Sequence, residues 1–226
     1  MAASTRLRHR FRPALPALCL ILALASSCAL PSLTTPPKLY LLTPKTTYSD
    51  QLPWITSQLL VEPPAAAAGL DSARIALSRS PTTLDYFAGV SWIDRAPTMI
   101  QTLMVESFER SQKIVSVGRD VVGLRADFLL KTELREFQAD YAGPPETTAP
   151  TIRVQINAKL VSLPRRSIDA NETFDAPVQA SSPAFDDVIA AWDEALGKAM
   201  RRLVEWTLIE ADRLERQRDG QRDADS

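Results

Sequence analysis

Few residues of this chain could carry out chemistry, and the scarcest of them is histidine. The chain contains a single histidine, His9, in a segment that we expect to be removed on export. A mature chain without histidine cannot build a Ser-His-Asp triad, a Cys-His pair or the usual histidine-rich zinc site. The sequence therefore predicts a protein with no catalytic residues, no metal and no other cofactor.

Two other patterns match active-site motifs only in part. Gly118 and Gly123 have the separation of the outer glycines of a phosphate-binding loop, but Leu124-Arg125 stands where that motif has Lys followed by Ser or Thr. Solvated or arginine-paired carboxylates are far commoner than catalytic pairs, so a hydrolase using carboxylates alone is a minor alternative. Its candidates are the acidic residues in or near apolar segments, Asp85, Asp94, Glu106 and Glu133.

The first 27 residues have the organisation of a signal peptide. Four arginines between Arg6 and Arg12 precede an apolar run from Ala14 to Ala25. This run is shorter than the roughly 18 apolar residues that a membrane-spanning helix needs. A basic start followed by a short apolar core and small residues is typical of a cleavable export signal. We therefore expect residues 1–27 to be removed.

Cys28 is the predicted site of lipidation. The small residues 25–27 before it resemble a bacterial lipobox, although Leu24 lies four places before the cysteine rather than three. An ordinary signal peptidase cutting after Ala25 would instead leave Cys28 as a free thiol. Several acyl chains on Cys28 would hold the protein on a membrane without a transmembrane helix. Residues 28–37, rich in Pro, Ser and Thr, would then form an extended, lipidated linker.

The residue after this cysteine bears on the choice of membrane. Ala29 stands where an Asp would, in enterobacterial sorting, favour retention in the inner membrane. We therefore predict a lipid anchor at the periplasmic face of the outer membrane, with inner-membrane retention or a soluble periplasmic form as alternatives. The only other cysteine, Cys19, lies within the signal peptide, so no intramolecular disulfide is expected.

The charge of the mature chain argues against nucleic acid as a partner. Removing residues 1–27 takes four of the 26 Lys and Arg residues and none of the 27 Asp and Glu residues, so the mature chain is acidic. Binding to nucleic acid depends on clustered Lys and Arg that displace counterions from phosphates. Adjacent basic pairs occur only at Arg165-Arg166 and Arg201-Arg202.

The apolar patterns predict a set of strands. Thr151 to Leu160 alternates apolar and polar residues, as in a strand with one buried face. Ala126 to Tyr141 is longer, and Phe137 falls on the face opposite to the earlier apolar residues, so we expect a β-bulge near Glu136. Shorter strands are expected at Lys38–Leu42, Ile55–Val61, Ala73–Ser78, Thr83–Phe87, Ile114–Val117 and Ser167–Gln179.

Two main helices are expected to cover this sheet. One opens at Pro97, because proline is tolerated in a first helical turn, and the other runs from about Pro183 with an apolar stripe. The predicted fold is a single α+β domain over residues 38–211, with a mostly antiparallel sheet packed against two helices. Residues 212–226 are charged, and we expect a disordered tail there.

Four tryptophans could contribute to a binding surface. Trp192 and Trp206 lie on the apolar stripe of the last helix and are better explained as core or interface residues. Trp92, close to Asp94 and Arg95, is the candidate for partner binding, because Trp and Arg often anchor interfaces. The alternative is that the segment from Trp92 to Arg95 only caps and staples the helix.

The order of several short motifs resembles the ABC-type transport auxiliary lipoproteins, which are similar to the paraquat-inducible C-type lipoproteins. The resemblance extends from Tyr40 to Trp206. The motifs that carry it are Leu39-Tyr40-Leu41-Leu42, Leu70-Asp71-Ser72-Ala73-Arg74-Ile75, Trp92-Ile93-Asp94-Arg95-Ala96-Pro97, Phe108-Glu109-Arg110-Ser111, Gly123-Leu124-Arg125-Ala126-Asp127-Phe128 and Glu133-Leu134-Arg135-Glu136-Phe137.

The resemblance implies a non-catalytic part of a transport system that carries lipid between membranes. Such lipoproteins accompany an inner-membrane permease, an ATPase and an MCE-domain protein that bridges the periplasm. In one version this chain docks the MCE assembly at the outer membrane, as a single copy or a homo-oligomeric ring. In another it carries phospholipid in an apolar pocket between sheet and helices. An envelope or cell-wall accessory lipoprotein that activates a periplasmic enzyme is the alternative from another class.

Overall fold

The computed structural model describes residues 35–119, 126–163 and 165–224. Contacts divide the chain into two compact units, Met1–Pro36 and Pro37–Ser226, and the second is the domain described below. The predicted signal peptide and Cys28 lie outside the described residues. None of the helices within the described ranges is long and apolar enough to cross a membrane.

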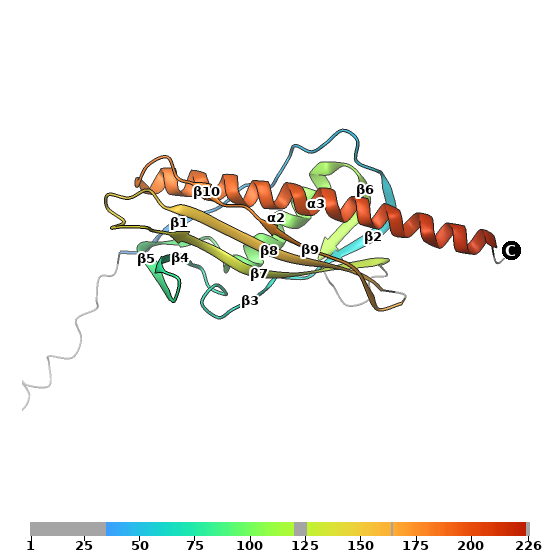
Figure 1. The fold of residues 1–226 in the computed structure, drawn as a ribbon, viewed down its shortest axis with the longest axis horizontal. Coiled ribbons are helices and arrows are strands. Elements are labelled where there is room, and N and C mark those ends of the chain that lie inside the picture. Colours follow the sequence, from blue (N-terminus) through green and yellow to red (C-terminus); the bar gives the residue numbers. More distant parts are fainter. Residues whose placement is uncertain (1–34, 120–125, 164, 225–226) are drawn as a thin grey trace, which may run out of the picture. The chain divides into compact units, whose positions relative to one another are not determined.

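The described residues form ten strands in one mixed sheet and two helices (Figure 1). The helices are α2 (Ala96–Ser111) and α3 (Phe185–Ala224). The strands are β1 (Lys38–Tyr40), β2 (Ile55–Val61), β3 (Ala65–Ala66), β4 (Arg74–Ser80), β5 (Thr83–Trp92), β6 (Ile114–Arg119), β7 (Phe128–Asp140), β8 (Thr151–Ser162), β9 (Ser167–Asp175) and β10 (Val178–Gln179).

The long antiparallel pair of β7 and β8 forms the centre of the sheet. The pairing shifts register between Leu134 and Glu136, so Arg135 is the extra residue of a β-bulge. The bulge places both Leu134 and Phe137 on the buried side, as the sequence predicted. Strands β9 and β10 continue the sheet by pairing antiparallel with β8.

Along its other edge, β7 pairs with three shorter strands, each at a different segment of its length. Strands β2, β3 and β4 all run parallel to β7, in the registers Leu59↔Phe128, Ala65↔Glu133 and Ala76↔Gln138. Strand β6 then pairs parallel with β2, β5 pairs antiparallel with β4, and β1 pairs parallel with β5. The sheet is therefore open and mixed, and its longest pairings are antiparallel.

Both helices pack against the sheet, and α3 runs along β8 (Figure 1). Helix α2 has proline in its first turn and ends at Gln112 in the left-handed conformation. Between sheet and helices lies a core that includes three mutually packed rings. The Trp192 ring lies 5.2 Å from that of Trp92 and 5.6 Å from that of Phe137. The predicted α+β class with two main helices is confirmed.

The prediction of a disordered tail is wrong for the residues that the structure describes, because α3 continues to Ala224. Its charged residues pair along the helix, as in the contacts of Arg213 with Glu210 at 2.8 Å and Arg216 with Asp212 at 2.7 Å. Such pairs at a spacing of three or four residues stabilise a helix. Leu214 is also buried, so the tail keeps an apolar contact with the domain.

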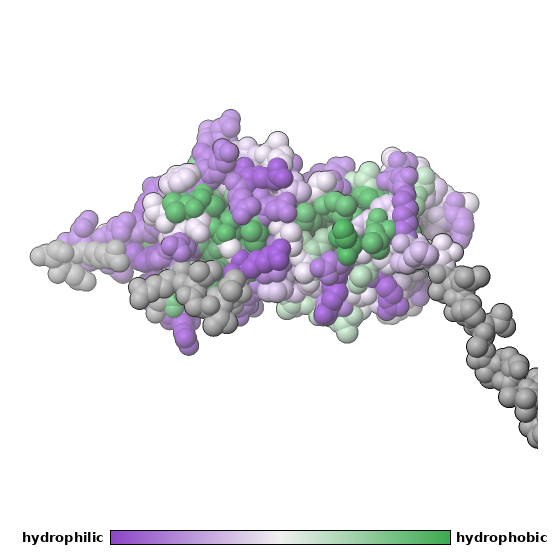
Figure 2. Space-filling model, turned by 180° about the vertical axis from the view of Figure 1, so that it is seen from behind, coloured by the Kyte–Doolittle hydropathy of each residue, from purple (hydrophilic) through white to green (hydrophobic). Residues whose placement is uncertain are grey.

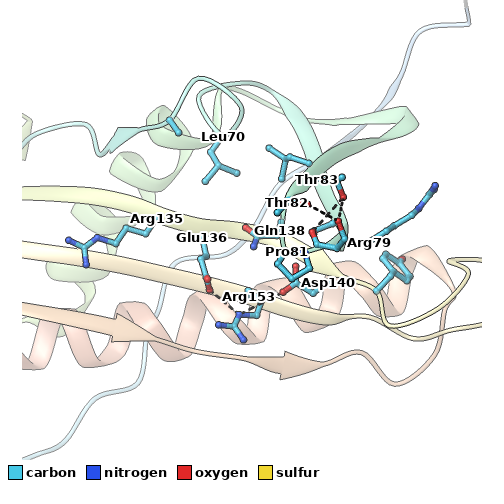
Figure 3. Close-up of a pocket in the computed structure, with 15 residues that line it drawn as sticks. Leu70, Arg79, Pro81, Thr82, Thr83, Arg135, Glu136, Gln138, Asp140 and Arg153 are labelled. Carbon is cyan, nitrogen blue, oxygen red and sulfur yellow. Dashed lines mark hydrogen bonds and ion pairs between the residues drawn. The ribbon is translucent and has the colours of Figure 1, made fainter.

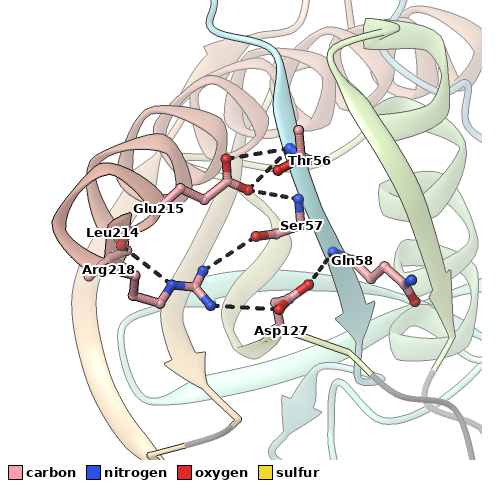
Figure 4. A network of polar contacts seen from close by, with 7 residues as sticks. All are labelled: Thr56, Ser57, Gln58, Asp127, Leu214, Glu215 and Arg218. Carbon is pink, nitrogen blue, oxygen red and sulfur yellow. Dashed lines mark hydrogen bonds and ion pairs between the residues drawn. The ribbon is translucent and has the colours of Figure 1, made fainter. Parts of the chain in front are cut away.

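A polar network attaches this end of α3 to β2 (Figure 4). The carboxylate of Glu215 accepts hydrogen bonds from the backbone N–H groups of Thr56 at 3.1 Å and Ser57 at 2.7 Å. The guanidinium of Arg218 lies 3.3 Å from the hydroxyl of Ser57 and 3.6 Å from the carboxylate of Asp127. These contacts come from segments far apart in the chain, which explains why charge composition alone gave a wrong prediction.

Candidate partner-binding surface

Trp92 does not face a partner. Its side chain is 1% exposed and packs between Trp192 and Phe137, with ring centroids 5.2 and 5.5 Å away. The prediction that Trp92 faces a partner is therefore wrong, because Trp92 is a core side chain. The physical reason is that Trp92 ends β5 on the face covered by α3.

The residues after Trp92 form the turn that begins α2. An Asp94 carboxylate oxygen accepts the backbone N–H of Arg95 at 2.6 Å, and the guanidinium of Arg95 pairs with Asp71. The N–H of Ala96 donates to the carbonyl of Ser72 at 3.0 Å. Asp94 and Arg95 are both exposed, but their known contacts organise the helix start. Their binding of a partner stays a prediction.

Sequence reasoning missed Ile93, which is the outward-facing residue of this motif. Its side chain is 57% exposed. Since neighbouring residues of an extended segment point to opposite faces, an inward Trp92 requires an outward Ile93. The signal was present in the sequence, but the choice between the two faces could not be made without the partner strand.

Strand β1 and the residue that follows it bring two more exposed hydrophobic residues to the same place. Leu39 is 58% and Leu41 is 62% exposed, whereas Leu42 is buried. Tyr40 is paired with Trp92, and its carbonyl accepts the N–H of Ile93 at 2.8 Å. Because paired residues point to the same side of a sheet, Leu39, Leu41 and Ile93 share the outer face. We call these three residues the β1 patch.

The inner side of β1 is fixed to the start of α3. The Tyr40 ring packs edge-on against Phe185 with centroids 5.1 Å apart, and the Lys38 amine lies 3.5 Å from the Asp186 carboxylate. The backbone N–H and hydroxyl of Thr43 donate to Asp193 at 2.6 and 2.8 Å. The exposure of the β1 patch is therefore a property of an ordered strand.

A groove of about 720 Å³ lies between the β4–β5 hairpin and the outer side of β7 and β8 (Figure 3). The Arg153 guanidinium lies there 2.9 Å from Glu136 and 3.8 Å from Asp140. Burial raises the pKa of Asp140, partly opposed by a hydrogen bond from Gln138 and by the charge of Arg153. Figure 3 shows Arg79 and Arg135 extending away from this centre. The lining of the groove is mixed, because apolar residues such as Leu70 and Leu84 stand beside the charged ones.

The four candidate carboxylates lie in separate elements of the fold. Asp85 lies in β5, Glu106 in α2, Glu133 in β7 and Asp94 in the turn before α2. Glu133 pairs with Arg135 at 3.0 Å. Within the described part of the chain, no hydrogen bond or ion pair joins two of these four, and no cluster of three or more potential metal ligands occurs.

Large side chains of the described residues are buried between the sheet and the helices. The largest fully buried ones include Trp92, Trp192, Phe108, Phe128 and Phe137. On the face opposite to the view of Figure 1, hydrophobic residues gather in separate groups with hydrophilic residues between them (Figure 2). The face shown in Figure 2 is therefore mixed.

Comparison with known proteins defines the class to which this fold and surface belong. Residues 40–204 match the ABC-type transport auxiliary lipoprotein component family. A crystal structure of protein XCC0632 from Xanthomonas campestris is 33% identical, with a TM-score of 0.71 over 84% of this chain and 99% of the other. The chain belongs to the family of ABC-type transport auxiliary lipoproteins.

A second solved structure supports the fold alone. It is described as an uncharacterized protein and is 12% identical, with a TM-score of 0.58 over 75% of this chain and 97% of the other. No curated protein matches the chain. As a member of its family, the protein is an auxiliary component of ABC-type transport.

Proposed function

We propose that this protein is a non-catalytic adaptor that docks an MCE assembly at the periplasmic face of the outer membrane. Its partners would be the MCE-domain protein and, through it, the inner-membrane permease and ATPase that move phospholipid between membranes. Family membership supports the connection with ABC-type transport. The observation that best supports the adaptor role is the packing of the described core, where the rings of Trp92, Trp192 and Phe137 meet, so we expect the domain to act through its surface.

The anchor in this proposal is an acylated Cys28, joined to β1 by residues 28–37. Acyl chains buried in a bilayer stabilise attachment by about 0.8 kcal/mol per CH₂ group, so several chains would hold the domain permanently. A composition rich in Pro keeps such a linker extended. The anchor would keep β1 close to the membrane, and the part of the domain away from β1 would bind the MCE assembly.

The carrier version of the function receives less support. A carrier needs an apolar cavity for acyl chains, and ligand sites are lined mostly by apolar side chains. The lining of the groove at the β4–β5 hairpin mixes apolar residues with charged ones such as Glu136, Asp140 and Arg153. An accessory lipoprotein that activates a periplasmic enzyme is a separate alternative, and it predicts an enzyme in place of the transporter among the partners.

The test is a pull-down of the tagged protein from fractionated membranes, with bound proteins identified by mass spectrometry. The variants are Cys28→Ala and, as the matched control, Cys19→Ala within the signal peptide. We expect the MCE-domain protein and permease with the wild type and the control, and loss of membrane attachment in Cys28→Ala. A Cys28→Ala protein that remains on membranes would refute the anchor.

The same Cys28→Ala protein separates the adaptor from the carrier, because it lacks acyl chains of its own. Native mass spectrometry of the purified variant should show the protein without phospholipid. If one phospholipid molecule is bound per chain, the carrier function is correct and the adaptor function is wrong. A periplasmic synthase in the pull-down, without transporter subunits, would favour the accessory lipoprotein.

A further inference from the structure

The exposed hydrophobic residues of the domain are unevenly distributed. Eight large hydrophobic side chains are exposed in the described part of the chain, and three of them make up the β1 patch. We propose that the β1 patch, Leu39, Leu41 and Ile93, rests on the bilayer surface in the anchored protein. This inference deepens the proposed function and rests on its anchor at Cys28.

The position of the patch in the chain argues for a bilayer as the occupant. Leu39 follows Cys28 by eleven residues, which span at most about 35–40 Å when fully extended. In the extended conformation of a Pro-rich linker, at about 3.1 Å per residue, they span about 34 Å. The membrane that holds the acyl chains is therefore always within reach of β1, whatever partner is bound.

The chemistry of the patch also fits a lipid surface. Its three side chains are purely aliphatic and more than half exposed. Aliphatic side chains gain free energy by entering the boundary between headgroups and acyl chains. The patch therefore presents only apolar side chains, which is what contact with the acyl boundary of a bilayer requires.

The order of β1 makes the contact geometrically defined. Its inner side is held by Tyr40 against Phe185 and by Thr43 against Asp193, so Leu39 and Leu41 have a fixed direction. A contact between this strand and the bilayer would fix the orientation of the domain relative to the membrane. The acyl chains alone hold the domain near the membrane but leave it free to turn.

The experiment places a fluorophore on the lipidated full-length protein in vesicles of phosphatidylethanolamine and phosphatidylglycerol that contain nitroxide-labelled phosphatidylcholine. The labelled variants are Leu41→Cys and Ile93→Cys. The matched controls are Ile168→Cys in β9, 61% exposed, and Val115→Cys in β6, 56% exposed. We expect quenching at positions 41 and 93 to exceed that at the controls several-fold, and circular dichroism to show that all variants are folded.

Equal quenching at all four positions, on protein that is attached to the vesicles, would overturn the proposal that the β1 patch contacts the bilayer. The proposed anchor at Cys28 would be unaffected. Failure of the protein to attach, or attachment of Cys28→Ala, would instead refute the anchor. Protection of Leu41→Cys from alkylation only at high protein concentration would identify a second copy as the occupant. Protection only with the MCE-domain protein present would identify that partner, and either result would overturn the proposal.

Discussion

The side chain of Trp92 stabilises the domain from within. It is 1% exposed and touches both Trp192 and Phe137. Replacing a buried tryptophan with alanine removes apolar contacts and leaves a cavity, at a cost of about 3–5 kcal/mol. We expect Trp92→Ala to lower the free energy of unfolding by this amount in urea denaturation.

The neighbouring Ile93→Ala is the matched control for this prediction. Ile93 is 57% exposed, and substitutions at such sites change stability by only about 0.5 kcal/mol. A Trp92→Ala protein of normal stability that no longer bound its partner would contradict the core assignment. In that case the original interface prediction would have been right.

The hydroxyl of Tyr48 connects the loop before β2 to helix α2. It lies 2.8 Å from the carbonyl of Ser107 and 3.0 Å from that of Lys45. Burial raises the pKa of Tyr48 to about 12, whereas an unfolded tyrosine ionises near its ordinary pKa of about 10. Ionisation in this range therefore favours the unfolded chain, so stability should fall as the pH rises from 10 to 12.

Thermal unfolding between pH 9 and 12 measures this dependence. Tyr48→Phe lacks the ionisable group and should show a smaller fall in melting temperature over the same range. At pH 9 it should be less stable than the wild type, because the carbonyls of Ser107 and Lys45 lose a donor. Identical pH profiles for the two proteins would contradict a raised pKa at Tyr48.

Which residues are apolar and how they alternate could be read from the sequence, but the direction of each face could not. The β-bulge was predictable because Phe137 breaks the alternation of its own strand. The burial of Trp92 and exposure of Ile93 were not, since both residues suit either face. The contact with Trp192, a hundred residues later in the chain, decides between them.

At the scale of elements, the last turns of α3 depend on the carboxylate of Glu215. It accepts the backbone N–H groups of Thr56 and Ser57, and a buried donor that loses its acceptor costs about 1–3 kcal/mol. We expect Glu215→Ala to destabilise the protein by this amount and to speed hydrogen exchange at Ser57 and in the helix beyond Leu214.

Arg216→Ala provides the control on the same turn. Arg216 pairs with Asp212, and its side chain is 75% exposed; exposed ion pairs contribute only about 0–1 kcal/mol. Its hydrogen exchange should resemble that of the wild type. Equal effects of the two substitutions would mean that the network with β2 does not hold the end of the helix.

The neighbours of each strand were the least predictable part of the fold. The sequence located β2 at Ile55–Val61 with the bounds that the structure gives. It did not indicate that β2, β3 and β4 would share one edge of β7, since local periodicity reports the buried face of a strand and not its partner. The end of α3 was misread for a similar reason, because its acceptors on β2 are distant in the chain.

At the scale of the whole molecule, α3 closes the core. It contributes buried residues from Val188 to Leu214 and packs on β2, β8, β9 and β10. A chain that ends at Ala184 should therefore fail to fold, and circular dichroism and limited proteolysis would show this. A chain that ends at Arg218 keeps the network with β2 and should retain a normal melting temperature.

The contact between β1 and α3 has a consequence for the time course of folding. Tyr40 and Thr43 meet Asp186 and Asp193 across 146 and 150 residues of sequence, and contacts of such separation form slowly because a long loop must close first. On the export route expected for this chain, β1 reaches the periplasm early and its partner helix arrives last. Strand β1, which follows Cys28 closely in the sequence, is therefore expected to reach its final position only after the end of the chain has arrived.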